Sequence, residues 1–297
     1  SVEVAAGGSQ TLAPEKSESW SAGLSWDQPF TNAFGLSLGA TYYEIDIRNT
    51  IIEPSGQFIV NDCYTSNTGN SAFCDRITRE VTDPQDNPNT PFLTFLDRGF
   101  INRDAQTARG VDINLAFDKT FTVFNRPVDF SMDIRANRQL ENSTLFTDDE
   151  GNRDFDTFQG EWGYPEWTTQ AFFRFDYDEF RFTWETRYLS SVVQDPEEVD
   201  DFSDINGIGD TCLGPPDDEL CRDVGYTSNY FQHNMSLYYY GDRWTFGGGI
   251  RNVLDEEPPF IDGTEILSVN NTPIGYGYDI NGRTYFFNVA VTFGGSQ

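Results

Sequence analysis

Four cysteines are the most reactive side chains of this sequence, and their spacing indicates disulfide chemistry. Cys63 lies close to Cys74, and Cys212 lies close to Cys221, each pair inside a polar stretch. Such local pairs are typical of disulfides formed in an oxidising compartment. A metal site would need Cys-x-x-Cys spacing or accompanying histidines, whereas the only histidine is His233. We therefore expect two disulfides, no metal ligands and no cofactor.

Catalytic chemistry is poorly supported by the same inventory. A Ser-His-Asp set needs a histidine held beside a nucleophile. His233 instead falls on the apolar phase of a segment in which apolar and polar residues alternate, which is typical of a structural residue. We expect no catalytic residues, and we interpret the chain as a non-enzyme.

Acidic side chains dominate the charge of the chain. The formal net charge is −29, which disfavours nucleic acid as a partner. The stretch 190–226 holds 11 Asp and Glu residues against one base, Arg222. Carboxylate oxygens suit Ca²⁺, but this stretch has no Asp-x-Asp-x-Asp-Gly pattern. A solvated surface loop is the simpler interpretation, and the calcium reading stays open.

Nine segments of alternating apolar and polar residues flank the cysteine-containing and acidic stretches and are predicted to be β-strands. Each has about the 9 to 11 residues that a tilted membrane-spanning strand needs. The clearest is 128–137, where apolar residues alternate with Asp, Ser, Arg and Asn. In the second segment the phase changes between Tyr42 and Ile45, which predicts a bulge or a strand leaving the membrane. The predicted strands are 17–26, 34–47, 106–118, 128–137, 167–177, 180–189, 230–240, 244–252 and 283–293.

The average composition fits membrane strands better than membrane helices. Mean hydropathy is −0.53, and no stretch approaches the roughly 20 apolar residues of a membrane helix. Because only alternate residues of a barrel strand face lipid, its mean hydropathy stays low. Aromatic residues make up 15% of the chain, which suits aromatic girdles at the membrane surfaces. We therefore predict an all-β fold, a transmembrane antiparallel β-barrel.

The connections between the predicted strands alternate between short and long. Outer-membrane barrels have short periplasmic turns and long extracellular loops, so all the long connections belong to one side. The predicted extracellular loops are 48–105, 139–166, 190–229 and 253–282, and they contain both cysteine pairs. An odd number of strands does not close alone in the usual way, so we expect further strands from a longer chain or another chain. The first residues lack the features of a signal peptide, so we expect the start of the exported protein to precede Ser1.

Polar residues on the opposite phase of these strands face the interior of the predicted barrel. Charged side chains within a membrane span are costly unless they are paired or wet. Two interpretations stay open: these residues pair with one another and with a domain inside the barrel, or they line a transport path. They are Asp112, Asp133, Arg135, Arg174, Arg181, Glu185, Arg187 and Arg251.

Trp162 and Tyr164 precede a strand that descends from the predicted extracellular side. They belong either to the interfacial aromatic girdle or to a surface that stacks on a ligand. Only the second interpretation predicts that replacing both by alanine weakens ligand uptake.

Motifs occur in a fixed order along nearly the whole chain. They are Leu12–Leu24, Ala40–Ile51, Cys63–Arg79, Thr107–Asp112 and Gly249–Pro259, followed by Tyr278-Asp279, Gly282–Tyr285 and Phe293. In this order they resemble the C-terminal half of TonB-dependent outer-membrane receptors, and Gly249–Pro259 is the most specific match. The tail Gly294–Gln297 departs from members that end at the terminal aromatic residue.

The resemblance implies the last nine strands of a 22-stranded barrel, with the N-terminal plug and its TonB box absent from this chain. It implies active import of a scarce nutrient across the outer membrane of a Gram-negative bacterium, such as iron in a ferric siderophore or an oligosaccharide in carbohydrate uptake. The implied partners are the TonB-ExbB-ExbD system through the plug, outer-membrane lipid and lipopolysaccharide, and a small nutrient ligand. A passive porin and a non-transporting adhesin or surface-assembly barrel are the alternatives.

Overall fold

The computed structural model describes residues 2–8, 12–65, 71–81, 91–147, 153–193, 227–259, 261, 268–270 and 272–293. The chain divides into two compact units. We call the first the knob unit; it comprises Ser1–Trp20, Glu44–Ala108 and Glu141–Thr157. We call the second the sheet unit; it comprises Ser21–Tyr43, Arg109–Leu140 and Phe158–Gln297.

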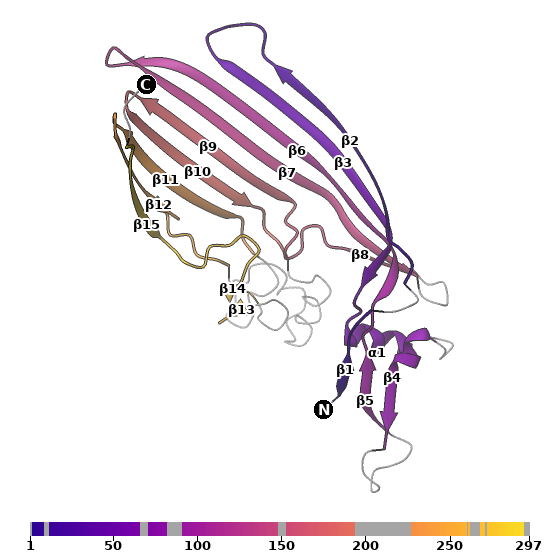
Figure 1. Ribbon diagram of the computed structural model, residues 1–297. Coiled ribbons are helices and arrows are strands. Elements are labelled where there is room, and N and C mark those ends of the chain that lie inside the picture. The colour runs from indigo at the N-terminus through magenta and orange to yellow at the C-terminus, as the bar shows by residue number, and fades with distance from the viewer. Residues whose placement is uncertain are drawn as a thin grey trace, which may run out of the picture. The chain divides into compact units, whose positions relative to one another are not determined.

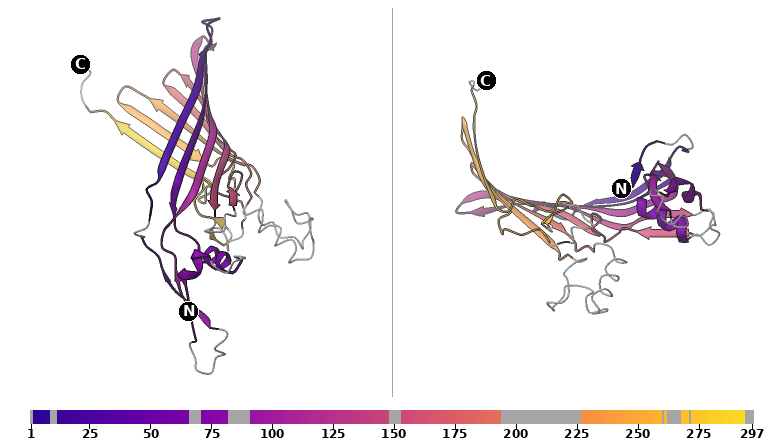
Figure 2. Two further views of the ribbon diagram at one scale, coloured as in Figure 1. Left: turned by 90° about the vertical axis from the view of Figure 1, so that its right-hand side faces the viewer. Right: turned by 90° about the horizontal axis from the view of Figure 1, so that it is seen from below.

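One large sheet dominates the sheet unit (Figure 1). Nine of its ten strands follow the order β15-β12-β11-β10-β9-β7-β6-β3-β2, which is the reverse of their order in the sequence, and β8 (Arg153–Thr157) pairs with β7 beside this path. Figure 2 shows that the sheet bends away from its plane toward the β12 and β15 edge. The strands are β2 (Lys16–Asp27), β3 (Gly35–Ile52), β6 (Ile101–Val123), β7 (Arg126–Thr147), β9 (Trp167–Tyr177), β10 (Phe180–Leu189), β11 (Tyr230–Tyr240), β12 (Trp244–Arg251) and β15 (Thr284–Val291), and a separate hairpin consists of β13 (Ser268–Val269) and β14 (Thr272–Pro273).

These nine strands coincide with the nine predicted segments, and β9 and β10 begin and end at the predicted residues. Three strands are longer than predicted, because β3 continues to Ile52, β6 begins at Ile101 and β7 continues to Thr147. They exceed the roughly 9 to 11 residues that cross a membrane. The predicted loops 48–105 and 139–166 therefore begin or end as regular strand.

The phase change in β3 has a structural counterpart. The strand is continuous, yet the boundary between the sheet unit and the knob unit falls between Tyr43 and Glu44. The bulge or exit from the membrane at this point of β3 stays a prediction.

Cross-strand register gives the sheet two chemically distinct faces. One transverse row on the first face reads Met132, Phe173, Trp184, Met235, Ile250 and Tyr285 from β7 to β15. Large apolar side chains on this face stay open to the surroundings: Leu237 is 52% exposed and Phe287 is 73% exposed. A soluble sheet would cover such a continuous apolar face, whereas a membrane strand leaves it to lipid.

A two-residue turn closes the hairpin of β6 and β7. Phe124 and Asn125 join β6 to β7, and both have positive φ, 49° and 61°. Two successive positive φ values match the right-handed twist of the flanking strands. The connection between the predicted strands 106–118 and 128–137 is therefore shorter than expected, because β6 continues to Val123 and β7 begins at Arg126.

The knob unit has a core of its own. Its elements are β1 (Glu3–Ala5), α1 (Gly56–Thr65), η1 (Ala72–Arg76), β4 (Ile77–Glu80), β5 (Phe92–Asp97) and β8 (Arg153–Thr157), and β1, β5 and β4 form a three-stranded sheet. Ile59, Phe73, Ile77 and Leu96 are buried together. Neither α1 nor η1 is long and apolar enough to span a membrane, and the described residues contain no other helix.

A disulfide ties this core together, since Cys63 of α1 is bonded to Cys74 of η1, as predicted. Ser71 caps η1 by accepting a hydrogen bond from the Phe73 amide at 3.0 Å, and its hydroxyl donates to the Asp62 carboxylate. Such caps satisfy amide groups that the first helical turn leaves unpaired. The predicted loop 48–105 is therefore a folded, covalently closed element along much of its length.

Candidate functional site

The predicted interior residues share the second face of the sheet. Arg135, Gln170, Arg187 and Gln232 form one transverse row across β7, β9, β10 and β11. The next row begins with Asp133 and includes Glu185. Arg174, Arg181 and Arg251 lie at positions of the same phase on β9, β10 and β12.

Two carboxylates of this face accept hydrogen bonds from neutral donors. Glu185 accepts hydrogen bonds from Gln170 Nε2 at 2.6 Å and from Asn234 Nδ2 at 3.0 Å. Asp112 accepts from Asn137 Nδ2 at 2.8 Å. Amide donors from neighbouring strands thus hold these acids in place without neutralising them.

The arginines of this face differ in their interaction partners. Arg181 pairs with Asp176 at 2.6 Å, and no other residue of the polar face forms a salt bridge within the described part of the sheet unit. Arg187 donates to the neutral Gln232 Oε1 at 3.1 Å, and the Arg251 guanidinium lies 5.6 Å from the centre of the Phe286 ring. Mutual pairing therefore accounts for part of the predicted set and leaves several guanidinium groups without a carboxylate.

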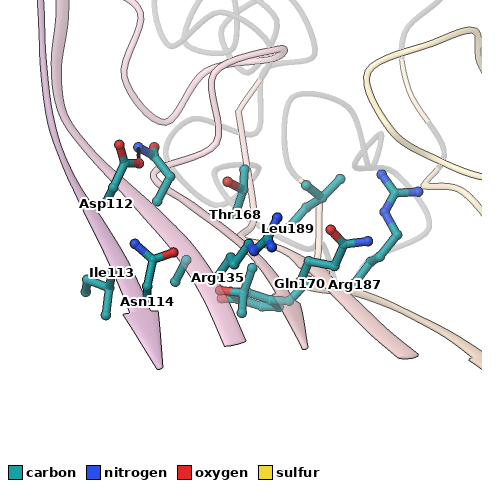
Figure 3. A pocket seen from close by; sticks show the side chains of 12 residues that line it. Asp112, Ile113, Asn114, Arg135, Thr168, Gln170, Arg187 and Leu189 are labelled. Atoms are coloured by element: carbon teal, nitrogen blue, oxygen red, sulfur yellow. Dashed lines mark hydrogen bonds between the residues drawn. The ribbon is translucent and has the colours of Figure 1, made fainter. Parts of the chain in front are cut away.

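Several concavities open on this face, and two of them share Arg187. The first has a volume of about 460 Å³ and is lined by Asp112, Arg135, Gln170 and Arg187, whose side chains lie along neighbouring strands (Figure 3). The second has a volume of about 660 Å³ and is lined by Arg187, Arg251 and side chains that include Tyr278 and Phe286. Arg187 belongs to both.

Trp162 is buried at one end of the sheet unit. It is 9% exposed, packs with Val192 and Ile261, and stacks on Tyr278 with ring centres 5.2 Å apart. Tyr164 is 43% exposed. Ligand contact by either residue stays a prediction, but the ring of Trp162 is already covered by other residues of the chain.

The same cluster restrains the connection that precedes β15. Gly275, Tyr276 and Gly277 all have positive φ, 95°, 59° and 92°. A tyrosine rarely adopts this conformation, whereas the two flanking glycines do so freely. Edge-to-face contact of Tyr276 with Trp162, at 5.5 Å between ring centres, stabilises this conformation.

Burial also shifts the ionisation of one residue in this connection. Tyr278 loses solvent in the aromatic cluster, which raises the pKa of its hydroxyl above the ordinary value of 10.0. A hydrogen bond with the Thr227 side chain opposes part of the shift. The hydroxyl therefore remains neutral at physiological pH.

Asn252 has a role that the sequence did not reveal. It is fully buried, and its side-chain amide both donates to the Glu256 carbonyl at 2.9 Å and accepts from the Glu256 amide at 2.8 Å. Asp255, three residues later, accepts from the Arg283 amide at 2.7 Å. The motif that begins Asn252-Val253 thus links the end of β12 to Arg283, the residue immediately before β15.

On the polar face, aromatic rings fill the space above glycines, which have no side chains. A Cβ added to Gly247 would lie 2.3 Å from Tyr238, and one added to Gly249 would lie 2.5 Å from Phe286. The rings therefore lie directly over glycines of the neighbouring strand, an arrangement that restores packing where a strand lacks side chains.

Several predictions fall outside the described residues. Cys212 and Cys221 both do so, as does 194–226, which is most of the acidic stretch. In the part of the chain that is described, no group of three or more His, Cys, Asp and Glu residues could hold a metal ion.

A family model described as "TonB dependent receptor-like, beta-barrel" matches residues 3–253. No curated protein matches the chain.

Two solved receptor structures have a similar fold. The ferric enterobactin receptor of Pseudomonas aeruginosa, in complex with BCV-L6, has a TM-score of 0.50 and 12% identity over 94% of this chain and 32% of that one. The siderophore receptor PirA of Acinetobacter baumannii has a TM-score of 0.49 and 14% identity over 95% of this chain and 32% of that one. The chain therefore spans about a third of the length of the receptors it resembles.

Proposed function

Because the chain belongs to the family of TonB-dependent receptor β-barrels, which are outer-membrane proteins of Gram-negative bacteria, we propose that it forms part of the wall of an energy-coupled importer. One observation carries the proposal: the register that leaves apolar side chains exposed on one face places a hydrogen-bonded polar network on the other. A transporter wall needs both faces, because lipid lies outside it and a wet or protein-filled interior lies inside.

The proposed cargo is a scarce nutrient, with a ferric siderophore preferred over an oligosaccharide. The preference rests on the ferric enterobactin receptor, whose fold the chain resembles. The identity of 12% supports the fold rather than the substrate, so the substrate is a proposal to be tested.

The proposed partners follow from this mode of transport. TonB, with ExbB and ExbD, would act through a plug inside a 22-stranded barrel to which this chain contributes nine strands. Outer-membrane lipid would cover the apolar face, and lipopolysaccharide would meet the extracellular connections, where the acidic stretch 190–226 is a candidate for divalent bridging or calcium binding.

We also propose that the chain has no catalytic role. His233 lies on the apolar face, where its Nδ1 is 2.9 Å from the Thr186 hydroxyl and its ring is 5.4 Å from that of Trp184. A histidine in this position faces lipid rather than the interior. His233→Ala should therefore leave uptake unchanged, and a selective loss of uptake with normal assembly would contradict this reading.

Uptake of radioactive iron tests the proposal. Cells that lack their own receptors would express the intact protein and receive a ferric catecholate siderophore. Uptake of labelled maltodextrins would be measured in parallel. We expect accumulation that disappears in cells lacking TonB. Accumulation that persists without TonB, together with ion conductance in lipid vesicles, would indicate a passive porin. Normal surface display without any uptake would indicate an adhesin or assembly subunit.

A further inference from the structure

We propose that Asn281-Gly282, in the connection between β12 and β15, is a site of spontaneous deamidation, a covalent modification that converts the Asn281 side chain into a carboxylate. The sequence contains Asn-Gly at two places, Asn206-Gly207 and Asn281-Gly282, and only the second lies within the described residues. Asparagine is among the thermally labile residues of proteins. The inference goes beyond the proposed uptake function and does not depend on it.

The reaction needs only water. The Gly282 nitrogen loses its proton to solvent and attacks Cγ of Asn281, which closes a succinimide ring. The C–N bond of the side-chain amide breaks, and its nitrogen takes up a proton and leaves as ammonia. Water then opens the ring at either carbonyl and gives aspartate or isoaspartate. No electrons are transferred, and the sum is amide plus water to carboxylic acid plus ammonia.

The attacking nitrogen is accessible. Gly282 lies outside the strands, and among the described residues nothing accepts a hydrogen bond from its amide. Because glycine has no side chain, the approach to Asn281 is uncrowded and the backbone can rotate into the attacking conformation. A φ of 66° at Gly282 shows that the chain already uses this freedom. The nucleophile is therefore neither hydrogen-bonded nor crowded.

The amide under attack is exposed and oriented. Asn281 is open to solvent, which supplies the water of the second step. Its Nδ2 donates to Oδ1 of Asp279 at 3.3 Å, and its backbone amide donates to the same oxygen at 2.9 Å. No described residue donates to the side-chain oxygen of Asn281. The amide is therefore anchored only through the nitrogen that leaves.

Two other asparagines of the chain are internal controls. Asn252 is fully buried, and its amide is hydrogen-bonded to Glu256 through both its nitrogen and its oxygen. Asn125 is as exposed as Asn281, but the next residue is Arg126, whose Cβ crowds the attacking nitrogen. The structure thus predicts that Asn281 reacts fastest, Asn125 more slowly and Asn252 slowest.

The new carboxylate alters a chain of hydrogen bonds that reaches the polar face. Asp279 accepts from Asn281 through one oxygen and from Gln232 Nε2 at 2.9 Å through the other. Gln232 in turn accepts from Arg187 at 3.1 Å. Deamidation replaces a donor beside Asp279 by a second negative charge, which repels it.

Isoaspartate also changes the main chain. The backbone then runs through the former side-chain carbon and gains one methylene group just before Gly282. Arg283 follows, and its amide donates to Asp255 at 2.7 Å. Lengthening the backbone beside this bond weakens it, so the Arg283 amide should exchange with solvent faster in the modified protein.

Incubation of the intact protein tests the inference. The protein in detergent would be kept in heavy-oxygen water at neutral and at mildly alkaline pH, digested in ordinary water and mapped by mass spectrometry. The heavy oxygen marks carboxylates that formed in the folded protein rather than during digestion. We expect labelled product at Asn281 at least about tenfold faster than at Asn125, and least at Asn252. The rate should rise with pH, because the nucleophile is a deprotonated nitrogen.

Asn281→Gln is the matched variant. Glutamine keeps the amide but places it one methylene group further from the Gly282 nitrogen, so the reaction at this position should be at least about tenfold slower. Hydrogen exchange at Arg283 should accelerate during incubation of the parent and stay constant in Asn281→Gln. Asn281→Asp carries the charge without the longer backbone, so it should keep slow exchange at Arg283.

Three outcomes would overturn parts or all of the inference. Labelled product at Asn281 that forms no faster than at Asn125 would show that the fold protects the pair. Product without heavy oxygen would show that the reaction needs the unfolded chain. Deamidation with unchanged exchange at Arg283 would contradict the predicted effect on the connection between β12 and β15.

Discussion

The sheet unit and the knob unit use apolar side chains in opposite ways. In the knob unit, Ile59 is fully buried and packs with Phe73 and Leu96. In the sheet unit, Leu237 and Phe287 lie exposed on a face that belongs to lipid. One chain thus contains both kinds of hydrophobic surface, and average hydropathy describes neither. The difference teaches that the role of an apolar residue here depends on which unit it serves.

Ile59→Ala should have the largest effect on stability. Removing a fully buried aliphatic side chain leaves a cavity and typically costs about 2 to 5 kcal/mol. Leu237→Ala, at an exposed position of the sheet unit, should cost far less in lipid. Limited proteolysis of the knob unit would report the first variant, and urea unfolding in lipid vesicles would report the second. Equal costs would contradict the division between the two units.

Leu237→Arg tests the other side of the comparison. An arginine on the lipid-facing side of a barrel costs about 2 to 4 kcal/mol at the membrane midplane and less toward either surface, so this variant should destabilise the barrel by up to about 4 kcal/mol. Ser236→Arg is the matched control, since Ser236 is the residue next to Leu237 in sequence and lies on the polar face. The readout is the free energy of unfolding in lipid vesicles. Similar losses for the two variants would mean that both faces meet the same surroundings.

Loss of the Cys63–Cys74 disulfide should affect the knob unit alone. The bridge closes a loop with a sequence separation of 11 residues, and for a loop of this length chain entropy predicts a loss of about 3 kcal/mol. Replacing both cysteines by serine should therefore speed proteolysis between α1 and η1. Heat-modifiable electrophoretic mobility, which reports assembly of the barrel, should stay normal. Failure of barrel assembly would show that the two units depend on each other.

Asn252→Ala should have a smaller effect within the sheet unit. It removes two hydrogen bonds to Glu256 and places alanine at a φ of 51°, which an asparagine tolerates better. The expected loss is about 1 to 3 kcal/mol. Asn252→Gly keeps the backbone conformation and loses only the bonds, so the difference between the variants isolates the two causes. Thermal unfolding in micelles measures both.

The smallest expected effect is a pH dependence at Tyr278. Its folded-state pKa is raised by burial, so the unfolded chain loses the proton first. The stability that the neutral hydroxyl contributes is therefore complete below pH 10 and is lost as the pH rises through the raised value. Absorbance of the phenolate should show a late-titrating tyrosine that is missing in Tyr278→Phe. Titration of all tyrosines at the ordinary pKa would contradict this burial.

Strand position and strand phase could be predicted because both are local properties. Alternation alone placed Trp184 and Arg187 on opposite faces, as the register shows. The burial of Trp162 could not be predicted in this way, because it depends on Ile261 and Tyr278, far away in the sequence. Likewise, α1 lies in a stretch without a clear period, and its core partner Phe146 comes from the end of β7.

The hydrogen bonds at the two ends of the connection between β12 and β15 have a practical consequence. Asn252 is hydrogen-bonded to Glu256, and Asp255 accepts a hydrogen bond from the amide of Arg283. These bonds join the two ends of the connection between β12 and β15. The entropy of closing a loop grows only slowly with its length once the ends are fixed. Peptide epitopes grafted beside the exposed Val269, away from the cluster that contains Ile261 and Tyr278, should therefore be displayed without disturbing the pairing of β12 with β15.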